Sequence, residues 1–325
     1  MVSLIIPCYN GEKFIDRCLD SVINQTDRNI ELILVNDGSN DKTNEIIKRR
    51  CKELKDKLTR FVYIEQENQG VGAACNVAFK EVSGEYLTLL DADDVMLPDS
   101  IKKRREWLDA NPLYGGVRTN GYYVSENNLN ITNHLLEVND YMKTKEDIFE
   151  ELFWGTTYCW PGTYMIRMEI LEVLYPDRNI FPSRYGQNLQ FVMMTAYKSK
   201  FGFIDIPLMK YVLREESLSH FSHGDVIRRE FEAMQGYREI REYLIDHFFV
   251  NTDKEKWRKQ TEKLYAGCFL NIAVKYGNKD LAKLYYKKAE NINALNLSLK
   301  LNYYKLMNPF KYYLLRILCK LRFIG

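Results

Sequence analysis

The chain has 325 residues, 46% of them hydrophobic and 28% charged, and its formal net charge is +2. This length accommodates one sizeable catalytic domain and a smaller second domain. A net charge this close to zero argues against a nucleic-acid-binding protein, because such proteins usually carry a broad excess of basic residues.

Apolar segments and helical segments alternate through the first ninety residues. Strands are expected at residues 2–7, 30–35, 61–64 and 86–90, and helices at 11–24, around Ile46 and Ile47, and from the small residues after Gly70. Such a βαβαβαβ order predicts an α/β fold with a parallel sheet covered by helices on both faces. Ligands of these sheets bind beyond the carboxyl ends of the strands.

Three carboxylates follow the fourth expected strand, at Asp91, Asp93 and Asp94. Such a cluster repels itself unless a cation binds there. Asp91 and Asp93 are two apart in an expected extended segment, so both reach one side, and hard oxygen ligands suit Mg²⁺ or Mn²⁺ with a diphosphate. The alternative is a solvated acidic turn in which Asp94 caps the next element.

Four motifs follow one another in the first hundred residues: VSLIIPCYNGEKFIDRCLDSVINQT, ELILVNDGSNDKT, ENQGVGAACN and GEYLTLLDADD. In this order they resemble the signature blocks of the family 2 glycosyltransferases with the GT-A fold. The resemblance implies a GT-A Rossmann-like, mostly parallel sheet. It also implies an enzyme that moves a sugar from a nucleotide diphosphate to an acceptor hydroxyl with inversion at the anomeric carbon.

The same resemblance assigns roles to single residues. Asp37 would accept a hydrogen bond from uracil N3–H, since an ionised carboxylate only accepts, although an Asp-Gly-Ser turn is its simpler alternative. Asp93 would bind the metal between the two phosphates, and Asp91 would face the ribose or a metal-bound water. The other donor-binding positions are Pro7, Tyr9, Asn10, Asn68, Gly70 and Ala92.

Two positions depart from the family pattern. Cys75 stands where these enzymes commonly have an arginine that helps to hold the donor, and as a small residue it is expected to be buried. Gln187 and Asn188 occupy the position of the usual acidic base, and neither amide can remove a proton, although both can orient a hydroxyl. The cations available to replace the arginine are Arg118, Arg167, Arg184, Lys210 and Arg214.

Several explanations of the missing base remain open. Another carboxylate can serve, or the donor phosphate can accept the proton, or the protein is a weak catalyst; Gln187 and Asn188 can also be a polar pair that begins a surface helix. His220 is the expected third metal ligand, with a plain surface loop as its alternative. The candidate carboxylates are Asp94, Asp205, Glu215 and Glu216.

The remaining chain suggests an acceptor half and a helical domain. Residues 154–163 are rich in aromatic residues that either stack on sugars or pack beneath a loop, and residues 203–214 predict a closing hairpin. We expect a GT-A catalytic domain at 1–223, with a donor half at 1–97 and an acceptor half at 98–223. A C-terminal α-helical domain is expected at 224–325.

The last thirty-five residues contain no acidic residue. Phe310, Tyr313 and Leu314 begin an apolar repeat at three-and-four spacing that continues to the end of the chain, among basic residues from Lys300 onward. This predicts a basic amphipathic helix. It either lies on an anionic inner leaflet or packs on another subunit or on the catalytic domain.

These observations predict an inverting glycosyltransferase that uses a UDP-sugar and Mn²⁺ or Mg²⁺, with a glycan, glycoprotein or lipid-linked acceptor. The alternatives are a catalytically silent sugar-nucleotide-binding scaffold subunit and a nucleotidyltransferase, which the lack of a glycine-rich basic N-terminal loop disfavours. An odd number of cysteines, seven, and the lack of a signal-like N-terminus predict a cytoplasmic protein, soluble or peripheral on the inner membrane face.

Overall fold

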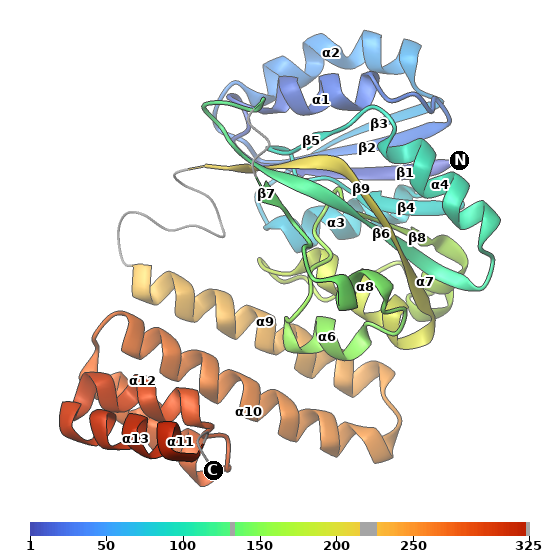
Figure 1. The fold of residues 1–325 in the computed structure, drawn as a ribbon. Coiled ribbons are helices and arrows are strands. Elements are labelled where there is room, and N and C mark those ends of the chain that lie inside the picture. The colour runs from blue at the N-terminus through green and yellow to red at the C-terminus, as the bar shows by residue number, and fades with distance from the viewer. Residues whose placement is uncertain (131–133, 215–225, 323–325) are drawn as a thin grey trace. The chain divides into compact units, whose positions relative to one another are not determined.

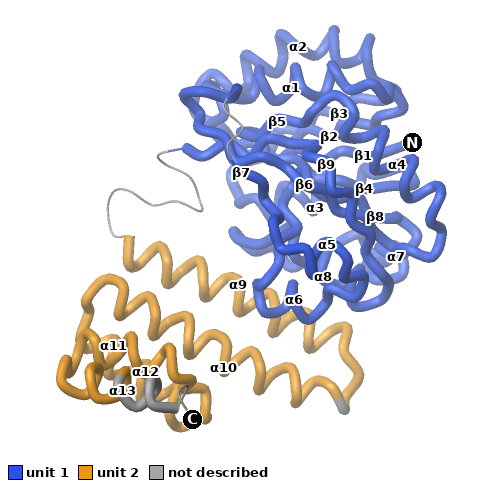
Figure 2. The backbone as a smooth tube through the Cα atoms, in the orientation of Figure 1, with its two compact units in different colours: residues 1–215 blue, residues 216–325 orange. Residues whose placement is uncertain are grey.

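The computed structural model describes residues 1–130, 134–214 and 226–322. The chain divides into two compact units, Met1–Glu215 and Glu216–Gly325 (Figure 2). The expected boundary between His223 and Gly224 lies outside the described residues. Within the described ranges, none of the helices combines the length and the apolar composition that a bilayer span requires.

The first half of the unit 1 sheet is parallel. Its strands lie in the order β3-β2-β1-β4, and each pairs in parallel with its neighbours (Figure 1). They span β1 (Val2–Cys8), β2 (Ile30–Asp37), β3 (Arg60–Gln66) and β4 (Tyr86–Leu89). Both β1 and β2 are buried along their whole length, which explains why their sequences are continuous apolar runs.

The second half of the sheet mixes parallel and antiparallel pairs. β8 is antiparallel to β4 and β6, β9 is parallel to β6, and the two short strands β5 and β7 pair antiparallel with β9 and β6. The bounds are β5 (Val95–Met96), β6 (Tyr114–Ser125), β7 (His134–Leu135), β8 (Tyr164–Arg167) and β9 (Lys200–Leu213).

The hairpin expected at residues 203–214 is wrong, because residues 203–213 belong to the single strand β9. The β6–β9 register shifts where Thr119 pairs with Ile204 and Asn120 pairs with Pro207, which leaves two extra residues on β9. A bulge of this kind admits a proline, since proline has no N–H for the ladder. The Ile-Pro sequence therefore marks an irregularity within a strand rather than a turn.

Helices cover both faces of the sheet, as expected (Figure 1). On one face the core joins the side chains of Leu4 and Ile6 to α1, α2 and α4, and on the other α3 packs on β1 and β2 and contacts α8. The bounds are α1 (Ile15–Ile23), α2 (Thr43–Lys57), α3 (Val71–Glu81), α4 (Ser100–Ala110), α5 (Asp140–Thr144), α6 (Phe149–Trp154), α7 (Met168–Leu174) and α8 (Gln187–Lys198).

The described part of unit 2 is helical. Gly277, at a left-handed φ of 67°, lies in the turn between α10 and α11. The side chain of Asn278 caps α11 by accepting a hydrogen bond from Leu281 N–H. Its core includes Leu270 and Leu299. The helices are α9 (Val226–Phe248), α10 (Asn251–Lys275), α11 (Lys279–Asn291), α12 (Leu297–Met307) and α13 (Pro309–Arg322).

Candidate active site

The strand order places a topological switch point at β1. The chain builds β2 and β3 on one side of β1 and then β4 on the other. In open α/β sheets, the connections on either side of such a point leave in opposite directions and open a crevice at the carboxyl ends of the strands. The predicted donor-binding residues lie near the carboxyl ends of β1 and β2 and in the loops that follow β1, β3 and β4.

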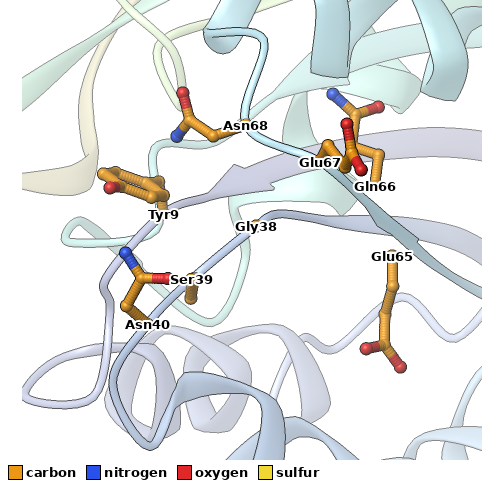
Figure 3. Close-up of a pocket in the computed structure, with 8 residues that line it drawn as sticks. All are labelled: Tyr9, Gly38, Ser39, Asn40, Glu65, Gln66, Glu67 and Asn68. Atoms are coloured by element: carbon orange, nitrogen blue, oxygen red, sulfur yellow. The ribbon is translucent and has the colours of Figure 1, made fainter.

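A pocket of about 590 Å³ lies at the ends of β1, β2 and β3. Figure 3 shows the Tyr9 ring and the side-chain amides of Asn40 and Asn68 gathered at one end, with Glu65 pointing away from them. The volume is in the usual range for a small-molecule site. The lining residues are Tyr9, Gly38, Ser39, Asn40, Glu65, Gln66, Glu67 and Asn68.

Only Tyr9 and Asn68 of this lining were predicted as donor-binding residues. The others lie at or directly after the ends of β2 and β3. Their position at the ends of predicted strands was the sequence signal that could have identified them. Two predicted residues, Pro7 and Ala92, are buried and do not line the pocket. Their donor-binding role stays a prediction.

Asp37 organises the loop after β3. Its side chain is only 3% exposed, and its oxygens accept hydrogen bonds from Gln66 Nε2 at 2.7 Å, Gln69 N at 3.0 Å and Gly70 N at 2.9 Å. A carboxylate has about four acceptor positions. Roughly one position is therefore left for a ligand, and the base contact predicted for Asp37 stays a prediction.

Asn10 and Gly38 hold the pocket loops together. Asn10 has a left-handed φ of 49°, its N–H donates to Ser39 Oγ at 2.9 Å, and its Oδ1 accepts from Asn40 N at 2.9 Å. A Cβ on Gly38, at φ 71°, would lie 2.6 Å from Asn68 N. The predicted donor residue Asn10 thus shapes the loop after β2, and the loops at residues 38 and 68 touch directly.

The acidic segment is a turn, so the expectation that it is extended is wrong. Asp94 N–H donates to the Asp91 carbonyl at 3.0 Å, because β4 ends at Leu89 and the aspartates that follow favour turns. Burial, and then the charge of Asp93, raise the pKa of Asp91 to about 7 against an opposing effect of Arg214. The two carboxylates therefore repel each other across the turn.

Two arginines surround Asp93. Arg214 forms an ion pair with Asp93 Oδ2 at 2.6 Å and lies over the Phe14 ring at 4.6 Å, and Arg17 donates to the Asp93 carbonyl at 2.9 Å. Arg214 Nε is buried without a hydrogen-bond partner among the described residues. The guanidinium of Arg214 thus faces the carboxylate of Asp93, the predicted metal ligand.

The donor set fits a hard divalent cation at Asp91 and Asp93. Both side chains offer carboxylate oxygens. Burial and then the charge of Asp93 raise the pKa of Asp91, and a cation would relieve both effects. Within the described ranges, no three His, Cys, Asp or Glu side chains form a metal-binding group. His220, the expected third ligand, lies outside the described residues.

Cys75 is fully buried, as predicted, and burial followed by the charges of Asp91 and Asp37 raises the pKa of its thiol. It stays neutral and supplies no charge. Of the five candidate cations, Arg214 lies at Asp93, and Arg184 lies beside Gly70, where an added Cβ would approach Arg184 Cγ to 3.0 Å.

Two of the three other cations have partners away from these loops. Arg118 is fully buried and donates to Thr157 Oγ1 at 2.7 Å. Arg167 donates to the Tyr114 carbonyl at 2.9 Å. Lys210 sits within β9 opposite Val95, the residue after the acidic turn. Arg184 and Arg214 are the two candidates that the structure places beside predicted donor or metal residues.

Asn188 has a structural contact. It lies in the first turn of α8, after Gly186 at φ 64°, and its Nδ2 donates to the Cys159 carbonyl at 2.6 Å, while Gln187 is 8% exposed. The pair does begin a helix, with Gln187 buried and Asn188 partly exposed. Asn188 fixes the 157–163 loop, whose Trp160 ring packs at 4.8 Å from that of Tyr211.

Neither described candidate for a substitute base is well suited. Asp94 is 1% exposed and accepts from Val212 N at 2.8 Å, so an acceptor hydroxyl cannot reach it. Asp205 accepts from Lys143 Nζ at 2.8 Å and from Asn120 Nδ2, and these bonds lower its pKa. Glu215 and Glu216 lie outside the described residues.

Residues 3–175 match the family model "Glycosyl transferase family 2". The chain belongs to glycosyltransferase family 2. A relative, an uncharacterized glycosyltransferase of Nostoc sp., is 31% identical over 252 residues, which cover 77% of this chain and 76% of that protein. The glycosyltransferase GlyA of Streptococcus pneumoniae is 45% identical over 101 residues, which cover 31% of this chain and 14% of GlyA.

The chain spans about half or less of the first curated relatives it matches, with 14%, 47% and 51% of their lengths covered. Among solved structures, S. aureus TarS 1-349 in complex with UDP-GlcNAc aligns with 95% of this chain and 91% of its own, at a TM-score of 0.62 and 17% identity. This likeness confirms the GT-A fold expected of the family 2 enzyme.

A second solved structure is the mannosyltransferase PcManGT from Pyrobaculum calidifontis in complex with GDP-Man and Mn²⁺. It covers 95% of this chain and 87% of its own, at a TM-score of 0.52 and 17% identity. At this identity the similarity concerns the fold alone.

Proposed function

We propose that this family 2 glycosyltransferase moves a sugar from a UDP-sugar to an acceptor hydroxyl, with inversion and with Mn²⁺ or Mg²⁺. One observation carries the proposal: the pocket at the ends of β1–β3 lies at the same sheet edge as the acidic turn after β4. A nucleoside in the pocket would extend its diphosphate toward Asp91 and Asp93. TarS with UDP-GlcNAc and PcManGT with GDP-Man and Mn²⁺ support a nucleotide-sugar donor and a metal.

The hydrogen bonds of Asp37 support uracil over guanine. Three protein N–H groups already occupy about three of its four acceptor positions. Uracil N3–H needs one acceptor, whereas the neighbouring N1–H and N2–H groups of guanine need two. The remaining capacity of Asp37 therefore matches the single imide donor of a uracil base.

We expect different roles at the diphosphate for the acidic and the basic side chains. Asp93 and Asp91 would hold the divalent cation, which as a Lewis acid stabilises the departing nucleoside diphosphate. Arg184 beside Gly70 and Arg214 beside Asp93 would add positive charge that Cys75 does not supply. Asn188 would act by fixing the 157–163 loop on the acceptor side, where a glycan, glycoprotein or lipid-linked hydroxyl would enter.

A donor assay separates this proposal from its alternatives. The purified chain is incubated with Mn²⁺ and each of UDP-glucose, UDP-galactose, UDP-GlcNAc and UDP-GalNAc, and UDP release is measured with and without acceptors. UDP release supports the transferase. Release of pyrophosphate from UTP and a sugar phosphate would indicate a nucleotidyltransferase. Donor binding without turnover would indicate the scaffold subunit, an alternative favoured by the structural contact of Asn188.

Asp93→Asn tests the metal assignment. We expect it to reduce Mn²⁺-dependent UDP-sugar binding at least about tenfold, because the variant loses a charged metal ligand while the side chain keeps its shape. Circular dichroism checks that the variant is folded. Asp56→Asn, at an exposed position on α2, is the matched control. Unchanged affinity in Asp93→Asn would remove Asp93 from the metal site.

A further inference from the structure

The helix α13 exposes apolar side chains. Asn308 caps its start by accepting a hydrogen bond from Lys311 N at 3.1 Å, and Pro309 occupies its first position. Phe310, Tyr313 and Leu314 are 77%, 63% and 49% exposed. Residues at i, i+3 and i+4 share one helix face. We call these three residues the α13 stripe.

The helix α13 contacts α12. Tyr312 and Leu315, which lie opposite the α13 stripe by helical spacing, are partly buried. The helix is therefore anchored in unit 2 by one face. The α13 stripe is the face that the described part of unit 2 leaves exposed to solvent.

Basic residues flank the α13 stripe on both sides. Since each residue turns an α-helix by about 100°, Lys311 lies roughly 100° to one side of the stripe and Arg316 roughly 100° to the other. Both are exposed; the Lys311 ammonium lies 5.4 Å from the Tyr304 ring centre, and Arg316 donates to Tyr312 Oη at 3.3 Å. An apolar strip between two basic edges suits a surface that is apolar inside and anionic outside.

The positive charge is concentrated at this end of the chain. Residues 291–325 contain six Lys or Arg and no Asp or Glu, while the whole chain has a net charge of only +2. The remainder is therefore net acidic. An electrostatic attraction to an anionic surface would be directed through this segment.

We propose that the α13 stripe, with Lys311 and Arg316, binds the surface of an anionic lipid bilayer. The apolar side chains would enter the boundary between headgroups and acyl chains, and the two basic side chains would extend to lipid phosphates. At 14 residues, α13 is too short to span a bilayer, which takes about 20. A second copy of the chain is a poorer occupant, because it would bring two basic edges together.

Vesicle sedimentation of the full chain tests this proposal. Phosphatidylcholine vesicles are compared with vesicles that also contain phosphatidylglycerol, at low and high salt. We expect partitioning at least about tenfold stronger onto the anionic vesicles and weaker at high salt. No binding, or equal binding to both vesicles, would overturn the proposal.

A pair of charge variants tests the basic edges. Lys311→Gln with Arg316→Gln should reduce partitioning roughly 25-fold, about fivefold for each basic residue. Lys52→Gln with Lys55→Gln, at exposed positions on α2, carries the same charge change and should have no effect. Equal effects of the two double variants would refute the assignment of the basic contacts to α13.

A second pair of variants tests the apolar contact. Phe310→Ser with Leu314→Ser should abolish binding, because it removes the side chains that would enter the bilayer. Leu113→Ser with Val173→Ser, at side chains 82% and 81% exposed, is the matched control and should bind as the wild type does. Undiminished binding of the α13 variant would contradict the proposal.

Light scattering and UDP binding complete the test. If the α13 stripe is covered by a second copy, the wild type is a dimer, the serine variant is a monomer and vesicles bind neither, which also contradicts the proposal. The charge variants keep the test valid if the serine variant does not fold. UDP binding is expected to be unchanged in all variants. The vesicle-binding result therefore tests the membrane proposal independently of the proposed sugar transfer.

Discussion

Arg214 forms an ion pair with the carboxylate that the proposed metal would bind. Its ion pair with Asp93 Oδ2 is 2.6 Å long, and the two side chains are 24% and 20% exposed. Arg214→Gln should therefore tighten Mn²⁺ binding in the absence of nucleotide by roughly fivefold, since a partly exposed ion pair is worth about 1 kcal/mol. Isothermal titration with Mn²⁺ alone measures this change.

The matched control for Arg214 is Arg49→Gln, which removes an arginine 2.9 Å from Asp16 on the surface. It should leave Mn²⁺ affinity unchanged. Weaker Mn²⁺ binding in Arg214→Gln would show that the guanidinium supports the metal site instead of competing for it.

Asn188 lies at the position of the family's base but donates to a carbonyl. Asn188→Asp would set an ionised oxygen against the Cys159 carbonyl, 2.6 Å from the present nitrogen. We expect a loss of roughly 1–3 kcal/mol in the free energy of unfolding, the usual cost of an unsatisfied buried group. Denaturant titration of Asn188→Asp and of the neutral control Asn188→Ala checks this, with the smaller loss in alanine.

The opposite result for Asn188→Asp would also be informative. Undiminished stability together with faster sugar transfer would mean that position 188 is an unused base position. The contact with Cys159 would then be incidental to the catalytic role.

At the level of elements, Glu31 ties β2 to β1 and to the turn before β4. Its buried carboxylate accepts from Ser3 Oγ, from Ser83 N and Oγ, and from Arg60 at 2.5 Å. Burial alone would raise the pKa of Glu31, but the hydrogen bonds from Ser3, Ser83 and Arg60 outweigh burial and lower it. The stabilisation is thus present above the unfolded pKa of about 4.3 and is lost as the pH falls through the folded value.

Glu31→Gln should lower the free energy of unfolding at pH 7 by roughly 1–3 kcal/mol, since it removes a charged acceptor from these donors. It should also flatten the loss of stability on acidification below about pH 4. Urea titrations across pH measure both effects. The exposed Glu45 on α2 supplies the control Glu45→Gln. If the free energy of unfolding of Glu31→Gln fell with acidification as steeply as that of the wild type, Glu31 would not be a source of the acid sensitivity.

The sequence predicted the elements that local pattern determines. Apolar runs located β1–β4 because strands buried on both faces need no alternation, and Asp37 and Asp93 were placed at the sheet edge by the strand order. The continuity of β9 was missed, because Ile206-Pro207 reads locally as a turn and only pairing with β6 makes it a bulge. The same limit applies to Arg214, whose contact with Asp93 joins residues far apart in the sequence.

For the whole molecule, the two units have separate cores. Leu4 and Ile6 belong to the unit 1 core, and Leu270 and Leu299 to that of unit 2. The pocket and the acidic turn are built from unit 1 alone, whereas the α13 stripe belongs to unit 2. The proposed donor binding and the proposed attachment to a bilayer would therefore depend on different cores, so each could be disturbed separately.

Calorimetry of the full chain should show this separation as two unfolding transitions. UDP with Mn²⁺ at about one hundred times its Kd should stabilise only the unit 1 transition, by about 2.7 kcal/mol. Leu270→Ala, at a fully buried position in α10, should lower only the other transition, by roughly 2–5 kcal/mol, because it leaves a cavity. A single transition that responds to both changes would mean that the two cores unfold as one cooperative unit.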